Sequence, residues 1–426
     1  MKIKSAVLAL AVFLFSTNIF AGVKSTDDLA ANAVSNDSAT AATAVNELRA
    51  MGQVGLNALF VKYSTDIERF IKTGAADDNW KRISAALDTV AMQRDAYTAD
   101  LYWYTDLEAA KVASKAQKKP ILSLRLLGNL NEEFSCANSR LFRAILYPNA
   151  AISKYLRENY ILHWKTVRPA PRITIDFGDG RKIERTITGN SIHYILDSDG
   201  TVIDALPGLY GPVSFLGYLK TGNEQFKLGS SLPPAQKALA LMKFRKGNFD
   251  KIVAGRNKAI QTAGVELTET RSGTIAILAA PMAVSKAIVV DEYSILRVFD
   301  DFAKFEPTIK FDDWDKLAKV YVPDLGVDAN TVGLVHRQNL KTGLSDEEFR
   351  VLFAKLDKFV ALDTTRNEFI FHAKLYEWLN QRQTGDLDAL NARVYDKIFQ
   401  TPNTDKWLGL YSNDVYTALD GNGIVN

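Results

Sequence analysis

The chain has 426 residues, of which 47% are hydrophobic and 24% are charged, and its formal net charge is +3. Lys2 and Lys4 supply two of these charges, so residues 22–426 carry only +1. A balance this close to neutral argues against long-range attraction to nucleic acid or to an anionic membrane. We expect a protein or peptide partner instead, with the oligomeric state left open.

The first 21 residues predict a signal peptide. Lys2 and Lys4 form a basic segment, residues 6–15 are apolar, and Ala21 ends a plausible cleavage site. The apolar run is too short for a good membrane span, and no later segment has the length that spanning requires. We therefore expect an exported bacterial protein, periplasmic or secreted, with no transmembrane segment after the signal is removed.

The single cysteine, Cys136, cannot form an internal disulfide. Exported proteins fold in an oxidising compartment, where structural cysteines normally come in pairs. Cys136 is therefore either buried and inert or a free thiol that meets partners.

The chain before residue 101 predicts a leader and a helical segment. Residues 22–56 are rich in small and polar side chains, which favours a flexible leader, or a weak helix around residues 42–51. In residues 57–100 the apolar side chains recur at helical spacing, as in Ile67, Phe70 and Ile71. This part is expected to be a helical preface to the domain that begins at residue 101.

Residues 101–225 alternate between helix and strand patterns. Helices are predicted at 106–118, 138–146, 150–158 and 212–221, and strands at 121–127, 160–167, 192–196 and 201–206. An inserted β-hairpin is expected at 168–188, with its turn at Gly178-Asp179-Gly180. This order implies a central mixed sheet flanked by helices, an α/β domain.

Residues 233–426 are mostly helical in pattern. Ser345-Asp346-Glu347-Glu348 is a capping box that opens a helix to about Leu362, and helices at 365–381 and 386–400 come after it. At ~100–200 residues per domain, the length suits two domains and a leader, with a mostly α-helical C-terminal domain.

Residues 103–219 contain three landmarks: Lys119-Pro120 before a strand, Cys136-Ala137-Asn138-Ser139 at a helix start, and the 195–202 hairpin followed by Pro207-Gly208. With these landmarks the segment resembles the thioredoxin superfamily. Residues 188–194 and 206–212 are similar to secreted bacterial thioredoxin-like proteins with Cys-x-x-Ser in place of Cys-x-x-Cys. The resemblance implies a thioredoxin-like domain with its site at the Cys136 helix.

Two departures from the family pattern bear on activity. Ser139 replaces the second cysteine, so no dithiol can cycle to a disulfide. The family's cis-proline would fall near Asn190-Ser191-Ile192, where no proline is present, and a trans bond is expected because a cis non-proline bond costs ~3 kcal/mol. The candidate catalytic residues are Cys136 and Ser139. The candidate substrate-binding residues are Trp103, Asn190, Ser191 and His193.

No metal or cofactor is predicted. In thioredoxin order the 121–127 strand lies between the strands of His163 and His193, which puts the two ~9.6 Å apart. That is too far for two ligands of one zinc ion. Asp197-Ser198-Asp199-Gly200 begins like a calcium loop, but Ile203 and Leu206 fall where oxygen ligands are needed, so a β-turn is expected.

Three functions remain open. The first is a non-cycling thioredoxin-like binding module that grips polypeptide or a partner beside Cys136. The second is a monothiol redox protein, a thiol-disulfide exchange enzyme, in which the helix start favours the thiolate form of Cys136 and mixed disulfides form. The third is a helical scaffold of a cell-envelope complex.

Overall fold

The computed structural model describes residues 25–186, 189–265, 311–381 and 386–399, together with Thr401, Thr404 and Lys406. The expected signal peptide lies outside these residues. Among the helices that the structure describes, none combines the length and the apolar character needed to cross a membrane.

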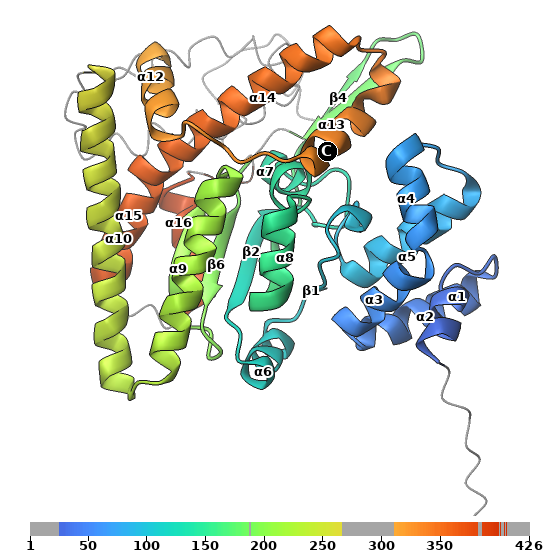
Figure 1. The fold of residues 1–426 in the computed structure, drawn as a ribbon, viewed down its shortest axis with the longest axis horizontal. Helices are drawn as coiled ribbons and strands as arrows, with labels where there is room; N and C mark the ends of the chain where they lie inside the picture. The colour runs from blue at the N-terminus through green and yellow to red at the C-terminus, as the bar shows by residue number, and fades with distance from the viewer. Residues whose placement is uncertain are drawn as a thin grey trace, which may run out of the picture.

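The N-terminal part is a small helical bundle, drawn in blue in Figure 1. Its elements are α1 (Thr26–Asn32), α2 (Ser38–Ala50), α3 (Gln53–Lys62), α4 (Ser64–Thr73), α5 (Asp78–Ala91) and the 3-10 turn η1 (Ala96–Thr98). They share a hydrophobic cluster that includes the fully buried Leu48, Leu56 and Leu59. The helical preface is therefore present, and it begins well before residue 57.

The expectation of a flexible leader over residues 22–56 is wrong from Thr26 onward. The small side chains in this segment allow its helices to pack closely, and this packing cannot be recognised from the spacing of large apolar residues. At Gly55 of α3, an added Cβ would lie 1.9 Å from the carbonyl oxygen of Leu48 in α2. The two helices therefore cross at a distance that only glycine permits.

A five-stranded mixed sheet forms the centre of the molecule. Its strands are β1 (Trp103–Tyr104), β2 (Ile121–Leu127), β3 (Ile161–Arg168), β6 (Ile192–Leu196) and β7 (Val202–Pro207), in the order β1-β3-β2-β6-β7. The first three are parallel to one another, and β6 and β7 are antiparallel to their neighbours. This arrangement is compatible with the expected thioredoxin-like fold.

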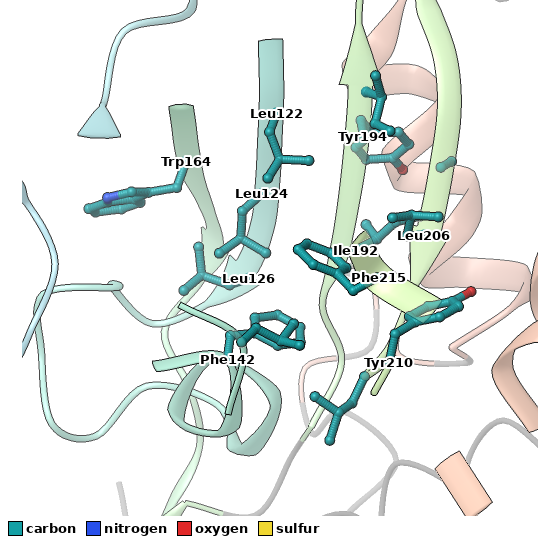
Figure 2. Close-up of a cluster of buried hydrophobic side chains, with 14 of the residues drawn as sticks. Leu122, Leu124, Leu126, Phe142, Trp164, Ile192, Tyr194, Leu206, Tyr210 and Phe215 are labelled. Atoms are coloured by element: carbon teal, nitrogen blue, oxygen red, sulfur yellow. The ribbon is translucent and has the colours of Figure 1, made fainter. Parts of the chain in front are cut away.

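One face of the sheet packs against helices close to it in sequence. They are α7 (Ala137–Leu141), the π-helical turn η2 (Phe142–Leu146), α8 (Ala150–Asn159) and α9 (Pro212–Ser230). Leu124 of β2, with Phe142 and Phe215 from the helices, belongs to the cluster shown in Figure 2. The helix α6 (Leu107–Gln117) contacts β2 and β3.

The connection from β3 to β6 carries a hairpin, as expected. Strands β4 (Arg172–Asp176) and β5 (Lys182–Thr186) form a separate two-stranded sheet. The described residues of this connection contribute no helix, and the sheet face with Arg125 and Tyr194 is covered by a distant element. That element is α16 (Leu387–Lys397), whose Asn391 accepts a hydrogen bond from the Tyr194 hydroxyl at 3.2 Å.

The remaining helices come after the sheet in the chain. They are α10 (Pro234–Ala263), α12 (Phe311–Tyr321), α13 (Ala329–Asn339), the 3-10 turn η5 (Leu340–Thr342), α14 (Asp346–Arg366), the π-helical turn η6 (Asn367–His372) and α15 (Ala373–Gln381). The capping box of Ser345 and Glu348 is confirmed.

The hydrophobic core is not divided at the expected boundary near residue 233. Val360, Phe371, Leu375 and Val394 belong to the same buried cluster as Leu124 of β2. A smaller cluster around Trp314 and Leu317 joins α10, α12 and α14. The C-terminal helices therefore complete the core of the sheet as well as packing on one another.

Candidate functional site

Cys136 lies at the junction of a strand and a helix, where the sequence places it. The chain leaves β2 at Leu127, and the backbone N–H of Cys136 returns to donate to the Leu127 carbonyl at 3.0 Å. Cys136 is the N-cap residue of α7, with extended backbone angles. α7 has only five residues before the π-helical turn η2 continues it.

Three of the candidate residues meet at the thiol. The Sγ atom of Cys136 lies 3.0 Å from Oγ of Ser191 and 3.5 Å from Oγ of Ser139. The Ser139 hydroxyl also lies 2.6 Å from Oγ of Ser135, which accepts a hydrogen bond from Arg143. The thiol is therefore one member of a local network of hydroxyl groups.

This network is closed to solvent. Cys136, Ser139 and Ser191 each have 0% of their surface exposed. A thiolate must reach the sulfur of another molecule to form a mixed disulfide. In this conformation Cys136 cannot do so, and its surroundings are those of a small buried side chain with a weak hydrogen-bonding group.

Tyr395 of α16 and Thr401 contact Asn190 in the loop that carries Ser191. The backbone carbonyl of Asn190 accepts a hydrogen bond from the Tyr395 hydroxyl at 3.0 Å. The side-chain amide of Asn190 donates a hydrogen bond to Oγ1 of Thr401 at 3.0 Å. Arg168 at the end of β3 donates to the Thr401 carbonyl at 2.9 Å. The place beside Cys136, where a bound polypeptide was expected, is taken by residues of this same chain.

Two candidate residues lie elsewhere in the core. The indole N–H of Trp103 donates to Gln93 at 2.8 Å, and Nε2 of His193 lies 2.9 Å from the Tyr147 hydroxyl. Both rings lie close to the ring of Tyr147. Burial lowers the pKa of His193 to about 3. In the structure Trp103 and His193 therefore pack around Tyr147 in the core.

His163 has a similar buried setting. Its Nδ1 lies 2.9 Å from Oγ of Ser123, and burial together with the charges of Arg125 and Lys165 lowers its pKa to about 3. β2 lies between the strands of His163 and His193, as the sequence predicts. Within the described parts of the chain, no three His, Cys, Asp or Glu side chains are grouped to hold a metal ion. All described peptide bonds are trans, including those of Asn190-Ser191-Ile192.

A second buried polar network is one that the sequence patterns did not predict. Asp204 of β7 accepts a hydrogen bond from the Tyr376 hydroxyl at 2.9 Å, and its other oxygen lies 2.9 Å from Nε2 of His372. Nδ1 of His372 lies 3.3 Å from the Tyr210 hydroxyl. The sequence does contain an indication of this network, because Asp204 is an acidic residue inside the apolar run Val202-Ile203-Asp204-Ala205-Leu206.

This second network attaches the π-helical turn η6 to the edge strand β7. The side chains of Asp204 and His372 are completely buried, as is the Tyr376 ring. Burial raises the pKa of Glu368, one turn before His372, above its usual value, and Tyr321 donates a hydrogen bond to it. Because the network is enclosed and paired, we assign it to structure.

Comparison of the chain with protein-family models, with curated protein sequences and with solved structures finds no match.

Proposed function

We propose that this chain is an exported thioredoxin-like protein that acts as a non-cycling interaction module, with Cys136 in a structural role. The strand order supports the thioredoxin-like part. The parallel strands β1, β3 and β2 are followed across the sheet by the antiparallel strands β6 and β7, so that β2 lies in the middle of the five, which is the order that the family resemblance implies. Export remains an inference from residues 1–21.

The burial of Cys136 is the observation that carries this proposal. A disulfide carrier needs an exposed thiolate and a second cysteine to release its client. Here the thiol has 0% exposure, and Ser139 stands where the resolving cysteine would be. The residues Tyr395 and Thr401 fill the neighbouring surface. Partners are therefore expected to bind the outer surface of the molecule.

The monothiol redox function is the competing candidate. Its support is the N-cap position of Cys136, where the first amides of a helix favour a negative charge. It requires Tyr395 of α16 and Thr401 to leave the Asn190–Ser191 loop. In the closed conformation, that function is not available.

Exchange with oxidised glutathione separates the two functions. The full chain and a Cys136→Ser variant are incubated with oxidised glutathione, and adducts are measured by intact-mass spectrometry. We expect no adduct on the native protein and complete modification of Cys136 in denaturant. We also expect the same negligible disulfide reductase activity from both proteins, because neither can complete a redox cycle.

A native adduct that forms as fast as the denatured one would overturn the structural role of Cys136. A second measurement follows the binding of the chain to its partners, by size-exclusion chromatography of cell-envelope extracts. If the full chain elutes within a larger complex from cell-envelope extracts, a Cys136→Ala variant of equal stability should elute in the same complex. Loss of that complex in the variant would favour the redox function.

A further inference from the structure

The charge of the molecule is concentrated on one pair of helices. Residues 212–264, which comprise α9, α10 and the turn between them, contain nine Lys and Arg residues and two acids, a net charge of +7. The whole chain carries +3, so all other residues together carry −4. The nearly neutral total therefore hides a strongly basic element.

Most of these cations face solvent. The exposed lysines are Lys220, Lys227, Lys243, Lys246, Lys251 and Lys258. Lys246 pairs with Asp250 on its own helix, and the other five form no ion pair with the described residues. Arg245 serves the interior instead, where it donates to the carbonyl groups of Val202 and Leu379. The exposed charge is thus carried by lysine.

Large apolar side chains are exposed among these lysines. Leu228, Leu239 and Met242 are 51%, 67% and 52% exposed. They lie near the turn that joins α9 to α10, and Leu228 lines a groove between the two helices with Lys243 and Lys251. Figure 1 shows this helical hairpin at the edge of the molecule farthest from the N-terminal bundle.

We propose that the α9–α10 hairpin binds an anionic phospholipid surface. Lysines beside exposed leucine and methionine side chains suit a membrane interface, because the ammonium groups attract anionic lipid and the apolar side chains can enter the headgroup region. The lysine ammonium groups would contact lipid phosphates, and Leu228, Leu239 and Met242 would enter the headgroup region. At 30 residues, α10 provides a contact of about 45 Å along the surface.

The choice of cation favours lipid over an acidic protein. Protein interfaces are depleted in lysine, and arginine is the residue that recognises carboxylates in a fixed geometry. The two arginines of the hairpin, Arg245 and Arg256, are buried or half-buried. Lysine gives a mobile point charge that suits a fluid array of phosphates. This inference does not depend on the role of Cys136.

Vesicle binding tests the proposal with the full chain and matched variants. Sedimentation with phosphatidylcholine vesicles, with and without phosphatidylglycerol, measures the partition coefficient. The test variant replaces Lys220, Lys227, Lys243, Lys251 and Lys258 by Gln. The control replaces five exposed lysines outside the hairpin, Lys72, Lys118, Lys154, Lys319 and Lys341, by Gln. The N-terminal apolar segment is common to all proteins compared.

We expect binding only when phosphatidylglycerol is present, and loss of binding when salt rises from about 0.1 M to about 0.5 M. The hairpin variant should bind at least about tenfold more weakly, and the control variant should bind within about twofold of the parent. Leu239→Ser with Met242→Ser should also weaken binding, because the apolar contact is lost. Thermal unfolding of each variant checks that it is folded.

Equal binding by the hairpin and control variants would overturn the proposal. So would equal binding to vesicles without phosphatidylglycerol. Soluble polyglutamate is the comparison for an acidic protein. If it displaces the chain from vesicles and the Leu239→Ser, Met242→Ser variant binds both targets like the parent, the surface recognises acidic polypeptide and the lipid assignment is wrong.

Discussion

At the scale of single residues, two polar groups near the centre of the sheet are paired with other polar side chains. Arg125 is buried in the central strand β2 and donates hydrogen bonds to Ser123 and Asp388. Cys136 is paired in the same way with Ser139 and Ser191. An unpaired polar group in such a position would cost about 1–3 kcal/mol, so these partners are part of the stability of the sheet.

The buried histidines make the first residue-scale prediction. His163 and His193 have pKa values of about 3 in the folded state, below the ordinary value of 6.5. The unfolded chain therefore takes up protons on these rings as the pH falls below 6.5, while the folded chain does not. The stability they contribute is complete above pH 6.5 and is lost as the pH falls from 6.5 towards 3.

Urea unfolding at a series of pH values measures this effect. Each histidine adds a slope of about 1.4 kcal/mol per pH unit to the free energy of unfolding in this range. His193→Gln should lower the overall slope by about 1.4 kcal/mol per pH unit, which corresponds to one proton. His336→Gln, at an exposed position, is the control. An unchanged slope in His193→Gln would show that this ring is not enclosed in the folded protein.

At the scale of elements, a turn of the sheet is clamped by a helix from the C-terminal region. Gly208, after β7, has a left-handed φ of +79°, and an added Cβ would lie 2.5 Å from the side-chain amide nitrogen of Asn367 in η6. That amide donates to the Leu209 carbonyl at 2.7 Å. Thr364 accepts from the Gly211 N–H at 2.8 Å, so the turn is held at several points.

Gly208→Ala is therefore expected to destabilise the protein by more than its backbone strain alone. A non-glycine residue in the left-handed region costs about 1–3 kcal/mol, and the collision with Asn367 adds to that cost. Gly178→Ala in the β4–β5 turn is the matched control. It has a similar φ of +75° and no neighbour within 4 Å of the added Cβ.

Chemical unfolding should show a larger loss for Gly208→Ala than for Gly178→Ala. Replacing Asn367 by Ala in the Gly208→Ala background should restore part of the difference by removing the collision. Equal losses in the two glycine variants would mean that η6 does not press on the turn.

At the scale of the whole molecule, local sequence patterns predicted the strands of the sheet but not the C-terminal helix α16 that packs on one of its faces. The strands β2, β3, β6 and β7, the β4–β5 hairpin and the helix after Ser345 could be predicted from periodicity and turn residues. The position of Cys136 at a helix start could be predicted in the same way. Each of these features is decided by neighbours within a few residues.

The features that local patterns missed depend on distant contacts. Tyr395 and Asn190 are separated by 205 residues, and no local pattern links them. α16 covers a sheet face on which the described residues of the β3–β6 connection place no helix. The close crossing of α2 and α3 at Gly55 was hidden because it depends on a missing side chain.

The central claim is that this chain covers its own thiol, and the rate at which Cys136 reacts with a soluble aromatic disulfide tests it most directly. We expect native protein to react about a thousandfold more slowly than protein in urea, because reaction requires local opening. Tyr395→Phe, which removes the hydrogen bond to Asn190, should raise the native rate about fivefold. A native rate within about tenfold of the unfolded rate, with no effect of Tyr395→Phe, would contradict the claim.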